Sequence, residues 1–317
     1  MKVTEKIKNA NKPLFSMEIL PPKKGENICN LFNTIESLSH HDPAFINVTY
    51  HREEHIYREV ENGLLKKHTV RKRPGTVGIC AAIKNKFNIE PVPHIICGGF
   101  NKEETENALI DLNFLGVKNL IALRGDPIKS EGIFKPEVNG HSYASELIEQ
   151  IVNLNKGIYL DPELDNSSPS DFCIGTAGYP EKHFESPNHE NDMRFLKQKV
   201  DQGAEYIITQ LFYDNEYYFR FVERCHEVGI TVPIIPGIKT ITSARQLSII
   251  PHFFHVTVPK TLSSKIENAK TNQELKNVGI DWTIAQCQEL IDYGVPALHF
   301  YTMGKAESVK IITEEVF

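Results

Sequence analysis

The feature that most constrains the fold is a recurring unit, a short apolar strand followed by a helix. Residues 120–123 show it clearly, because four apolar residues stop abruptly at Arg124, Gly125 and Asp126. An unbroken apolar run is typical of a strand buried on both faces of a parallel sheet. The carboxyl ends of such strands open onto the ligand crevice, so this charged step favours binding or catalysis. A solvated turn with an ion pair is the alternative.

The same pattern predicts eight strands, at residues 15–22, 45–50, 92–97, 120–123, 172–180, 206–212, 232–238 and 297–302. Helices are predicted near 26–38, 53–67, 108–115, 142–154, 191–202, 216–228, 282–293 and from 305 onward. A short strand at 77–83 would be peripheral. Eight strand-then-helix units close most naturally into a (β/α)₈ TIM barrel, an α/β fold with residues 1–317 as a single domain. A doubly wound sheet is the alternative, although no strand is followed by G-x-G-x-x-G.

Composition narrows the class of protein. Of 317 residues 40% are hydrophobic, yet no apolar run approaches the roughly 18 residues that span a bilayer. The net charge is −6, which argues against a nucleic-acid partner, and the basic cluster at 66–73 is interpreted as a solvated helix end. Six cysteines are scattered without a C-x-x-C pair, so neither a metal site nor a disulfide framework is indicated.

Two segments fall outside the repeating units. Residues 1–13 form a polar N-terminal segment that lacks the apolar region of a signal peptide, so a cytoplasmic, reducing location is expected. Residues 160–171 are rich in Asp, Ser and Pro and are interpreted as a surface excursion.

Polar side chains gather where the predicted strands end. If the barrel closes, its mouth collects Glu18, Thr49, His94, Arg124, Asp126, Tyr179, His183, Gln210, Lys239 and Tyr301. Glu18 shares a strand face with Ser16, so its carboxylate must face a polar cavity. Glu18 and Asp126 come from different strands, and two carboxyl groups near one ligand have their pKa values pushed apart. This arrangement suits proton-coupled chemistry.

Three of these residues allow more than one interpretation. His94 lies within an apolar strand and could be a core histidine with satisfied hydrogen bonds. Gln210 lies in the middle of a strand, where a buried amide needs partners, so a ligand-facing role is favoured. Lys239 could form a Schiff base, but a solvated or anion-binding lysine fits its place at a strand edge better.

A series of motifs resembles one known family. FSMEILPP, VTY, PHIIC, ALRGDP, AGYPEKH, KQKVDQGAEYIITQLFYD, IIPGI and HFYT occur in this order. Together they resemble the 5,10-methylenetetrahydrofolate reductases, flavin enzymes built on a (β/α)₈ barrel. The resemblance runs from about Phe15 to the end of the chain and covers the catalytic barrel, so no C-terminal regulatory domain, and no inhibition by S-adenosylmethionine, is expected.

The resemblance implies an activity. Members pass hydride from NADH or NADPH to FAD in a ping-pong reaction and reduce 5,10-methylenetetrahydrofolate to 5-methyltetrahydrofolate, which supplies methyl groups for methionine synthesis. Small-molecule partners, no nucleic acid, no membrane and a homo-oligomer are expected. The sequence contains no ribose-binding motif that would distinguish NADH from NADPH. A Schiff-base lyase using Lys239 and a non-catalytic folate- or flavin-binding barrel are the competing hypotheses.

The resemblance also implies roles for individual residues. Glu18 is the expected general acid, a role that fits a carboxyl group on an otherwise apolar strand, whose pKa desolvation would raise toward the working pH. Asp126 is the expected second catalytic residue, near flavin and pterin. The residues expected to line FAD are Thr49, His94, Arg124, Gly125, Asp126, Tyr179, His183, Asp192 and Lys199. The residues expected to bind the folate substrate are Glu18, Gln210, Tyr301 and Lys305.

Two positions depart from the family pattern. Ala244 stands where bacterial members can carry an aromatic residue that stacks on nicotinamide or folate, so stacking must come from elsewhere or be dispensed with. Lys305 stands where arginine is frequent in the family. An arginine can bind the carboxylate of the glutamate tail in a bidentate manner, whereas a lysine offers a single point of positive charge.

Overall fold

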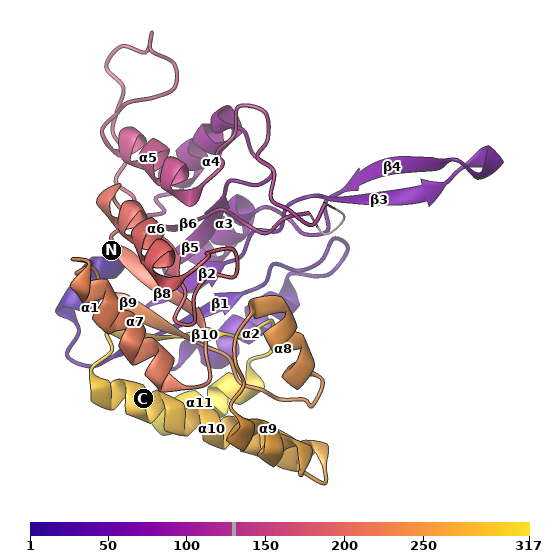
Figure 1. Ribbon diagram of the computed structural model, residues 1–317. Coiled ribbons are helices and arrows are strands. Elements are labelled where there is room, and N and C mark those ends of the chain that lie inside the picture. The colour runs from indigo at the N-terminus through magenta and orange to yellow at the C-terminus, as the bar shows by residue number, and fades with distance from the viewer. Residues whose placement is uncertain (129–130) are drawn as a thin grey trace.

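Eight parallel strands close into a barrel in the computed structural model, which describes residues 1–128 and 131–317 (Figure 1). The barrel strands are β1 (Leu14–Ile19), β2 (Phe45–Val48), β5 (Pro91–Ile96), β6 (Asn119–Leu123), β7 (Cys173–Gly178), β8 (Tyr206–Leu211), β9 (Ile234–Ile238) and β10 (Ala297–Tyr301). Their order around the barrel is β1-β10-β9-β8-β7-β6-β5-β2. The predicted single-domain (β/α)₈ fold is therefore confirmed.

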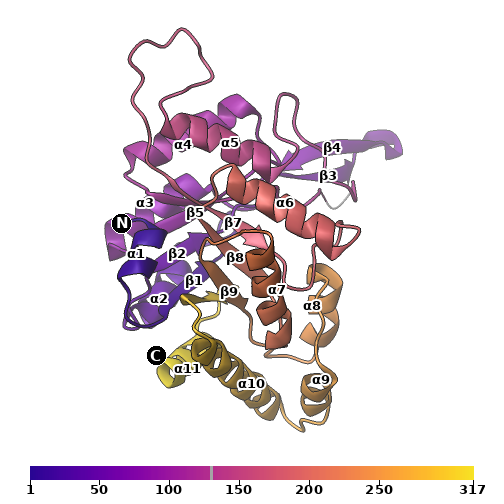
Figure 2. The same cartoon turned by 60° about the vertical axis from the view of Figure 1, so that its left-hand side comes forward.

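Helices surround the barrel, and the two views show them on its outside (Figures 1 and 2). They are α1 (Val3–Asn9), α2 (Cys29–Ser39), α3 (Thr76–Phe87), α4 (Lys102–Phe114), α5 (Ala144–Asn155), α6 (His189–Asp201), α7 (Asn215–Glu227), α8 (Gln246–Phe254), α9 (Lys260–Glu267), α10 (Asn272–Tyr293) and α11 (Glu307–Val316). None of the described helices combines the length and apolar character that crossing a membrane requires.

The barrel has two apolar layers because successive strand residues point to opposite faces. Outward-facing residues such as Met17 and Leu120 join the large core beneath the helices. Inward-facing residues such as Phe45, Ile121 and Tyr206 fill the lower interior in a separate cluster. The packed interior leaves the upper, carboxyl ends of the strands to polar side chains.

The N-terminal segment packs against the barrel, although the composition of residues 1–13 is polar. Within it, α1 places a fully buried Val3 in the lower interior cluster. The Val3 N–H donates to Asn119 Oδ1 at 2.7 Å, and Lys6 Nζ donates to the Ala44 carbonyl at 2.5 Å. This helix therefore closes the end of the barrel opposite the mouth.

The predicted charged helix at 53–67 is wrong. The structure has an antiparallel hairpin there, made of β3 (Glu54–Glu59) and β4 (Leu65–Val70) and joined by a single 3₁₀ turn (Glu61–Gly63). Asn62 and Gly63 adopt φ values of 68° and 70°, which an α-helix cannot accommodate. Asn-Gly between two strands is the strongest local signal for a hairpin.

The predicted peripheral strand at 77–83 is also wrong, since this segment lies in α3. Ile79, Cys80 and Ile83 are buried on one side of the helix, a spacing of three and four residues that is typical of a helix. Residues 160–171 contain neither helix nor strand. Helices α8 and α9 and the first part of α10 were not predicted.

Candidate active site

Glu18 occupies the mouth of the barrel at the end of β1. It is in register with Asn47 of β2 on one side and with Tyr301 of β10 on the other. Ile238 of β9 is in register with Phe300 of β10, so Lys239, the next residue, falls beside Tyr301. Cross-strand neighbours share a face, which places Glu18, Tyr301 and Lys239 in one row on the inward face.

Glu18 also contacts His94 of the neighbouring region of β5. Glu18 Oε2 lies 3.4 Å from His94 Nε2, and both side chains are largely buried. Burial raises the pKa of Glu18 to about 8, with the positive charge of Lys239 acting in the opposite direction. Burial, reinforced by His51, lowers the pKa of His94 to about 3. At neutral pH the pair is therefore a protonated carboxyl beside a neutral imidazole rather than an ion pair.

The pKa of Glu18 is raised as expected for a desolvated carboxyl group on an apolar strand, whereas the expected influence of a second carboxylate is not found. Desolvation is the main cause, and Asp126 is not among the charges that act on Glu18. Asp126 is exposed in the loop after β6. Its charge contributes to a raised pKa of Tyr179.

A second polar layer lies one step deeper in the barrel, and the sequence analysis did not identify it. His299 on β10 is fully buried, and its Nδ1 lies 2.9 Å from Ser16 Oγ on β1. Burial lowers its pKa to about 3, so the ring is neutral. The alternating pattern of the strand ALHFYT could have revealed it, because His299 shares a face with Tyr301.

Lys239 is held at the mouth beside Glu18. Burial lowers its pKa to about 8, with the positive charge of Lys305 adding to this and Glu18 opposing it. The ammonium group therefore carries its charge through neutral pH while lying in the row that holds the protonated carboxyl. Its position identifies Lys239 as a charge acting on Glu18.

The three other predicted folate-binding residues differ in whether their polar atoms already form hydrogen bonds within the protein. The Tyr301 hydroxyl donates to the Thr209 carbonyl at 2.6 Å. Gln210 Oε1 accepts from the Leu211 N–H at 3.0 Å, which leaves its amide nitrogen for a ligand. Lys305 is exposed beyond β10.

Arg124 and Gly125 shape the opposite side of the mouth. Arg124 Nη1 donates to Glu185 Oε2 at 2.6 Å, and its guanidinium lies 5.0 Å from the centre of the Phe134 ring. Gly125 has φ of +84°, and a Cβ there would lie 3.1 Å from Ile96 Cδ1. The loop after β7 supplies Glu185, a partner that no sequence pattern indicated.

The loop after β7 and helix α6 complete this side. The Tyr179 and His183 rings meet edge to face at 4.6 Å. Asp192 is buried and accepts from Ser186 Oγ at 2.8 Å and from the His183 N–H at 3.2 Å. Lys199 Nζ donates to the Ala177 carbonyl at the end of β7 at 2.6 Å, and burial lowers its pKa to about 8.

These residues fit an anionic, aromatic cofactor. Arg124 and Lys199 supply positive charge, and Thr49 supplies a hydroxyl whose Oγ1 lies 3.2 Å from His51 Nε2. Asn47 Oδ1 is buried without a hydrogen-bond partner among the described residues, so a donor on a bound molecule would satisfy it. Cationic groups and a Cβ-free turn are the groups that bind phosphates.

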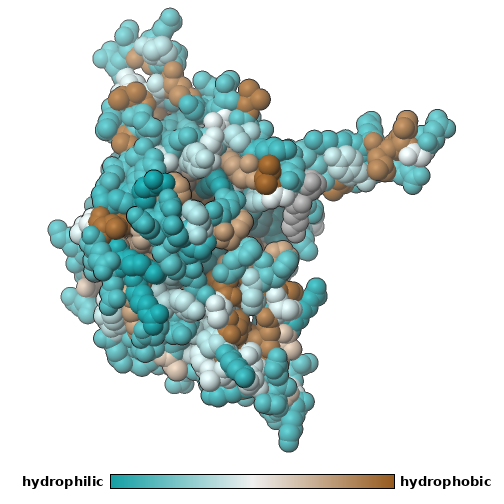
Figure 3. Space-filling view, viewed as in Figure 1, coloured by the Kyte–Doolittle hydropathy of each residue, from teal (hydrophilic) through white to brown (hydrophobic). Residues whose placement is uncertain are grey.

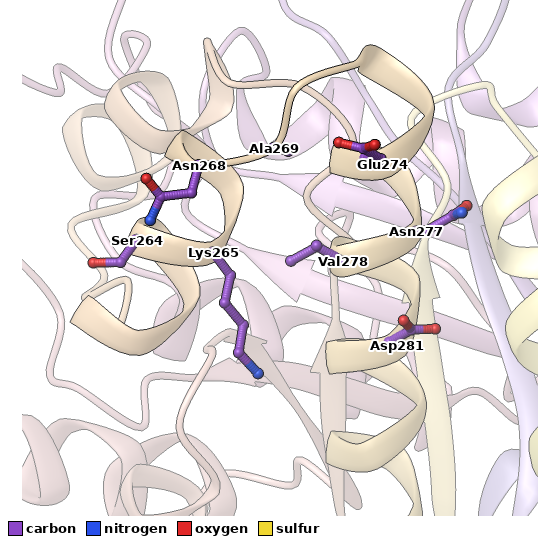
Figure 4. Close-up of a pocket in the computed structure, with 8 residues that line it drawn as sticks. All are labelled: Ser264, Lys265, Asn268, Ala269, Glu274, Asn277, Val278 and Asp281. Carbon is purple, nitrogen blue, oxygen red and sulfur yellow. The ribbon is translucent and has the colours of Figure 1, made fainter.

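A separate groove of about 510 Å³ lies between α9 and α10 (Figure 4). It contains none of the predicted site residues.

His40, His41 and Glu314 form a separate cluster, in which three atoms that could bind a metal ion lie within 4.8 Å of one another.

Comparison with known proteins identifies the family. The family model described as "Methylenetetrahydrofolate reductase" matches residues 2–316. The 5,10-methylenetetrahydrofolate reductases of Salmonella typhimurium and Escherichia coli are 32% and 31% identical over 293 residues, with 92% of this chain and 86% of each relative covered. The probable methylenetetrahydrofolate reductase (NADH) of Oryza sativa subsp. japonica is 31% identical, with 97% of this chain covered. This chain spans 49% of that relative.

A solved structure agrees on the fold. An uncharacterized protein from Clostridium thermocellum that binds two copies of 5-methyl-5,6,7,8-tetrahydrofolic acid superposes with a TM-score of 0.61 at 15% identity, covering 98% of both chains. At this identity the similarity concerns the barrel alone. The match to the family model over nearly the whole chain shows that this protein belongs to the methylenetetrahydrofolate reductase family.

Proposed function

We propose that this protein is a flavin-dependent methylenetetrahydrofolate reductase, which reduces 5,10-methylenetetrahydrofolate to 5-methyltetrahydrofolate with NADH or NADPH. The observation that carries the proposal is a protonated Glu18 at the mouth of the barrel, with a pKa of about 8. Relatives are named methylenetetrahydrofolate reductases, some with NADH and one with NADPH as the co-substrate.

Glu18 serves as the general acid. Opening the five-membered ring of the substrate needs a proton on the departing nitrogen, and a carboxyl with a pKa near the working pH provides it. The neutral His94 beside it leaves this proton on the carboxyl rather than taking it. Gln210 has a free amide nitrogen for the pterin, and Tyr301 and Lys305 line the route of the rest of the folate.

The opposite side of the mouth holds the cofactor. When bound, FAD would accept hydride from the nicotinamide and deliver it to the folate methylene carbon in a second, ping-pong step. Arg124 and Lys199 would bind its anionic groups. The other proposed contacts are Thr49, His94, Gly125, Asp126, Tyr179, His183 and Asp192, and Asp126 would also orient the folate.

The wider setting follows from the activity. The product carries a methyl group at the oxidation level needed for methionine synthesis, so a methyltransferase is the expected consumer. All six cysteines lie within the described residues and are unpaired, which suits a reducing cytoplasm. We also propose that the enzyme is a homo-oligomer.

An absorption spectrum tests the proposal. Purified protein, reconstituted with FAD if colourless, should show flavin bands that bleach with NADH or NADPH without oxygen and return when methylenetetrahydrofolate is added. A protein that binds no flavin, but is trapped covalently on Lys239 by borohydride with a carbonyl substrate, would instead support the lyase hypothesis. Flavin bands that no nicotinamide bleaches would indicate a binding protein.

A further inference from the structure

Two consecutive histidines at the end of α2 lie close to a glutamate near the end of α11. The two helices pack against each other on the outside of the barrel (Figures 1 and 2). Leu38 of α2 and Ile312 of α11 belong to the same apolar core, so packing fixes both backbones. Each of His40, His41 and Glu314 offers one possible metal ligand atom, and these atoms lie within 4.8 Å of one another. The cluster therefore connects two rigid elements of the fold.

The cluster lies at the end of the barrel opposite the mouth. The His41 ring meets the ring of Phe15 edge to face, with 6.2 Å between the ring centres. Phe15 is near the start of β1, whereas Glu18 is near its end at the mouth. The lower part of the surface, where α10 and α11 lie, is mainly hydrophilic in the space-filling view (Figure 3). The cluster is thus separate from the proposed catalytic site and has access to water.

The turn after α2 holds the two imidazole rings together. The His41 N–H donates to the Leu38 carbonyl at 3.1 Å, and the Asp42 N–H donates to the Ser39 carbonyl at 3.0 Å. Asp42 has φ of 50°, which ends the helix. The ring centres of His40 and His41 lie 3.9 Å apart, with an angle of 44° between the ring planes. The backbone therefore presents two imidazoles at one place.

These rings lack ordinary partners for their nitrogen atoms. His41 Nε2 is buried and makes no hydrogen bond within the described part of the chain. His40 Nε2 lies 4.0 Å from Glu314 Oε1, which is too long for a hydrogen bond. Buried polar atoms are normally paired, so an unpaired one in a folded protein indicates a missing partner. A neutral imidazole carries a lone pair on one nitrogen, and a metal ion is a partner that this lone pair can bind.

The donor set fits a divalent first-row transition metal such as Zn²⁺. Imidazole and carboxylate atoms bind zinc at about 2.0–2.2 Å, so the ligand atoms of a tetrahedral site lie about 3.3 Å from one another. The His40 and Glu314 side chains are each 50% exposed, so both can turn to reach that spacing. Water would supply the fourth ligand. Ca²⁺ and Mg²⁺ prefer oxygen ligands, so two imidazoles disfavour them.

One positive charge opposes the binding of a cation. Lys310 Nζ lies 3.9 Å from Glu314 Oε1, one turn away on α11. Because Lys310 is 47% exposed, its ammonium group can turn into water when an ion binds. A surface pair of this kind contributes little to stability, so the carboxylate loses little by exchanging the lysine for a metal ion.

We propose that His40, His41 and Glu314 bind one divalent transition-metal ion of the zinc class, which fastens α2 to α11. The site contains no cysteine, so the spacing of the cysteines could not indicate it. In a TIM barrel the end opposite the active site serves stability, so the role of this ion is structural. The proposal is independent of the reductase activity, and no step of the reaction passes through the ion.

Calorimetric titration of the full chain with ZnCl₂, after metals are removed with a chelator, tests the proposal. The wild type should bind one ion per chain with a Kd of about 10 μM or below. Excess zinc should raise its melting temperature by at least about 3 °C, because the ion binds only the folded chain. In H40Q, H41Q and E314Q the Kd should rise at least about tenfold, and the shift in melting temperature should be lost.

Three further variants separate this cluster from other ligands on the surface. H226Q and E315Q remove an exposed histidine and an exposed glutamate outside the cluster, so both should bind zinc as the wild type does. K310Q should lower the Kd for zinc, because it removes the cation that competes for Glu314. A Kd that is unchanged or raised in K310Q would contradict the placement of the ion beside this carboxylate.

Two further results would overturn the proposal. A wild type that binds no zinc below about 100 μM would do so. Zinc binding that persists in H40Q and E314Q would show adventitious binding to other histidines only. H41Q also loses the ring contact with Phe15, so H40Q and E314Q decide the outcome if circular dichroism shows that H41Q is unfolded. Flavin binding and flavin reduction are measured on the same zinc-free samples, which distinguishes failure of the metal site from failure of the assigned function.

Discussion

Glu18 Oε2 lies 3.4 Å from His94 Nε2, and burial keeps both groups uncharged at neutral pH. The raised pKa of one and the lowered pKa of the other have the same origin, because desolvation disfavours the charged form of each. Glu18 is thereby kept protonated at the mouth of the barrel without the influence of a second carboxylate.

Glu18→Gln should change how stability depends on pH. The pKa of this carboxyl rises from 4.5 to about 8 on folding, so between these values the unfolded chain releases a proton that the folded chain retains. The contribution of Glu18 to the free energy of unfolding is then full below the lower value and falls as pH rises toward 8. The melting temperature of Glu18→Gln relative to the wild type should increase from pH 5 to pH 8. A constant difference would contradict the raised pKa.

Lys239→Met should move the pH dependence of folate reduction. The positive charge of Lys239 opposes the rise in the pKa of Glu18, so its removal should raise that pKa further. The alkaline limb of the rate of flavin reoxidation by methylenetetrahydrofolate should shift to higher pH, whereas Lys239→Arg should keep it nearer the wild-type position. A limb unchanged in Lys239→Met would show that this lysine does not act on Glu18.

Lys199→Met should weaken flavin binding. Its ammonium group is buried beside the end of β7, and loss of one charge-assisted contact should raise the Kd for FAD by about tenfold or more. Lys197→Met is the matched control, since Lys197 pairs with Asp201 on the outer part of the same helix. Fluorescence titration of the apoprotein with FAD measures both. Equal affinities of the two variants for FAD would show that Lys199 does not contribute to FAD binding.

Gly237→Ala should destabilise the barrel at the layer of His299, one step below Lys239. A Cβ there would lie 2.2 Å from the Thr209 carbonyl oxygen and 2.6 Å from the Tyr301 ring, and overpacking of this kind costs about 1–3 kcal/mol or more. Gly78→Ala is the control, because nothing lies within 4 Å of its Cβ position in α3. Urea denaturation should show a loss of stability in the first variant and none in the second.

The barrel and its mouth could be predicted because both depend on local patterns. Apolar runs such as residues 120–123 define buried strands, and alternation along β1 places Glu18 on the inward face. The hairpin was missed because the dense charges of residues 53–67 were given more weight than the Asn62-Gly63 turn. The pairing of Arg124 with Glu185 depends on the irregular loop after β7, which carries no periodic signal.

The size of the rise in the pKa of Glu18 could not be predicted from the sequence either. Alternation gives the direction of a side chain, but the pKa depends on how completely neighbouring strands exclude water. Tyr301, Asn47 and Lys239 reach the Glu18 row only through closure of β10, β2 and β9 around β1. That register is a property of the closed barrel.

The most direct test of the account separates the two hydride transfers in Glu18→Gln. Stopped-flow absorbance without oxygen would follow bleaching of the flavin by NADH or NADPH and its return with methylenetetrahydrofolate, with Glu26→Gln as an exposed control. The account predicts near-normal bleaching and a return slowed by at least about 100-fold, the usual contribution of a general acid. Equal loss of both steps, or a normal return, would contradict the role of Glu18 as the proton donor.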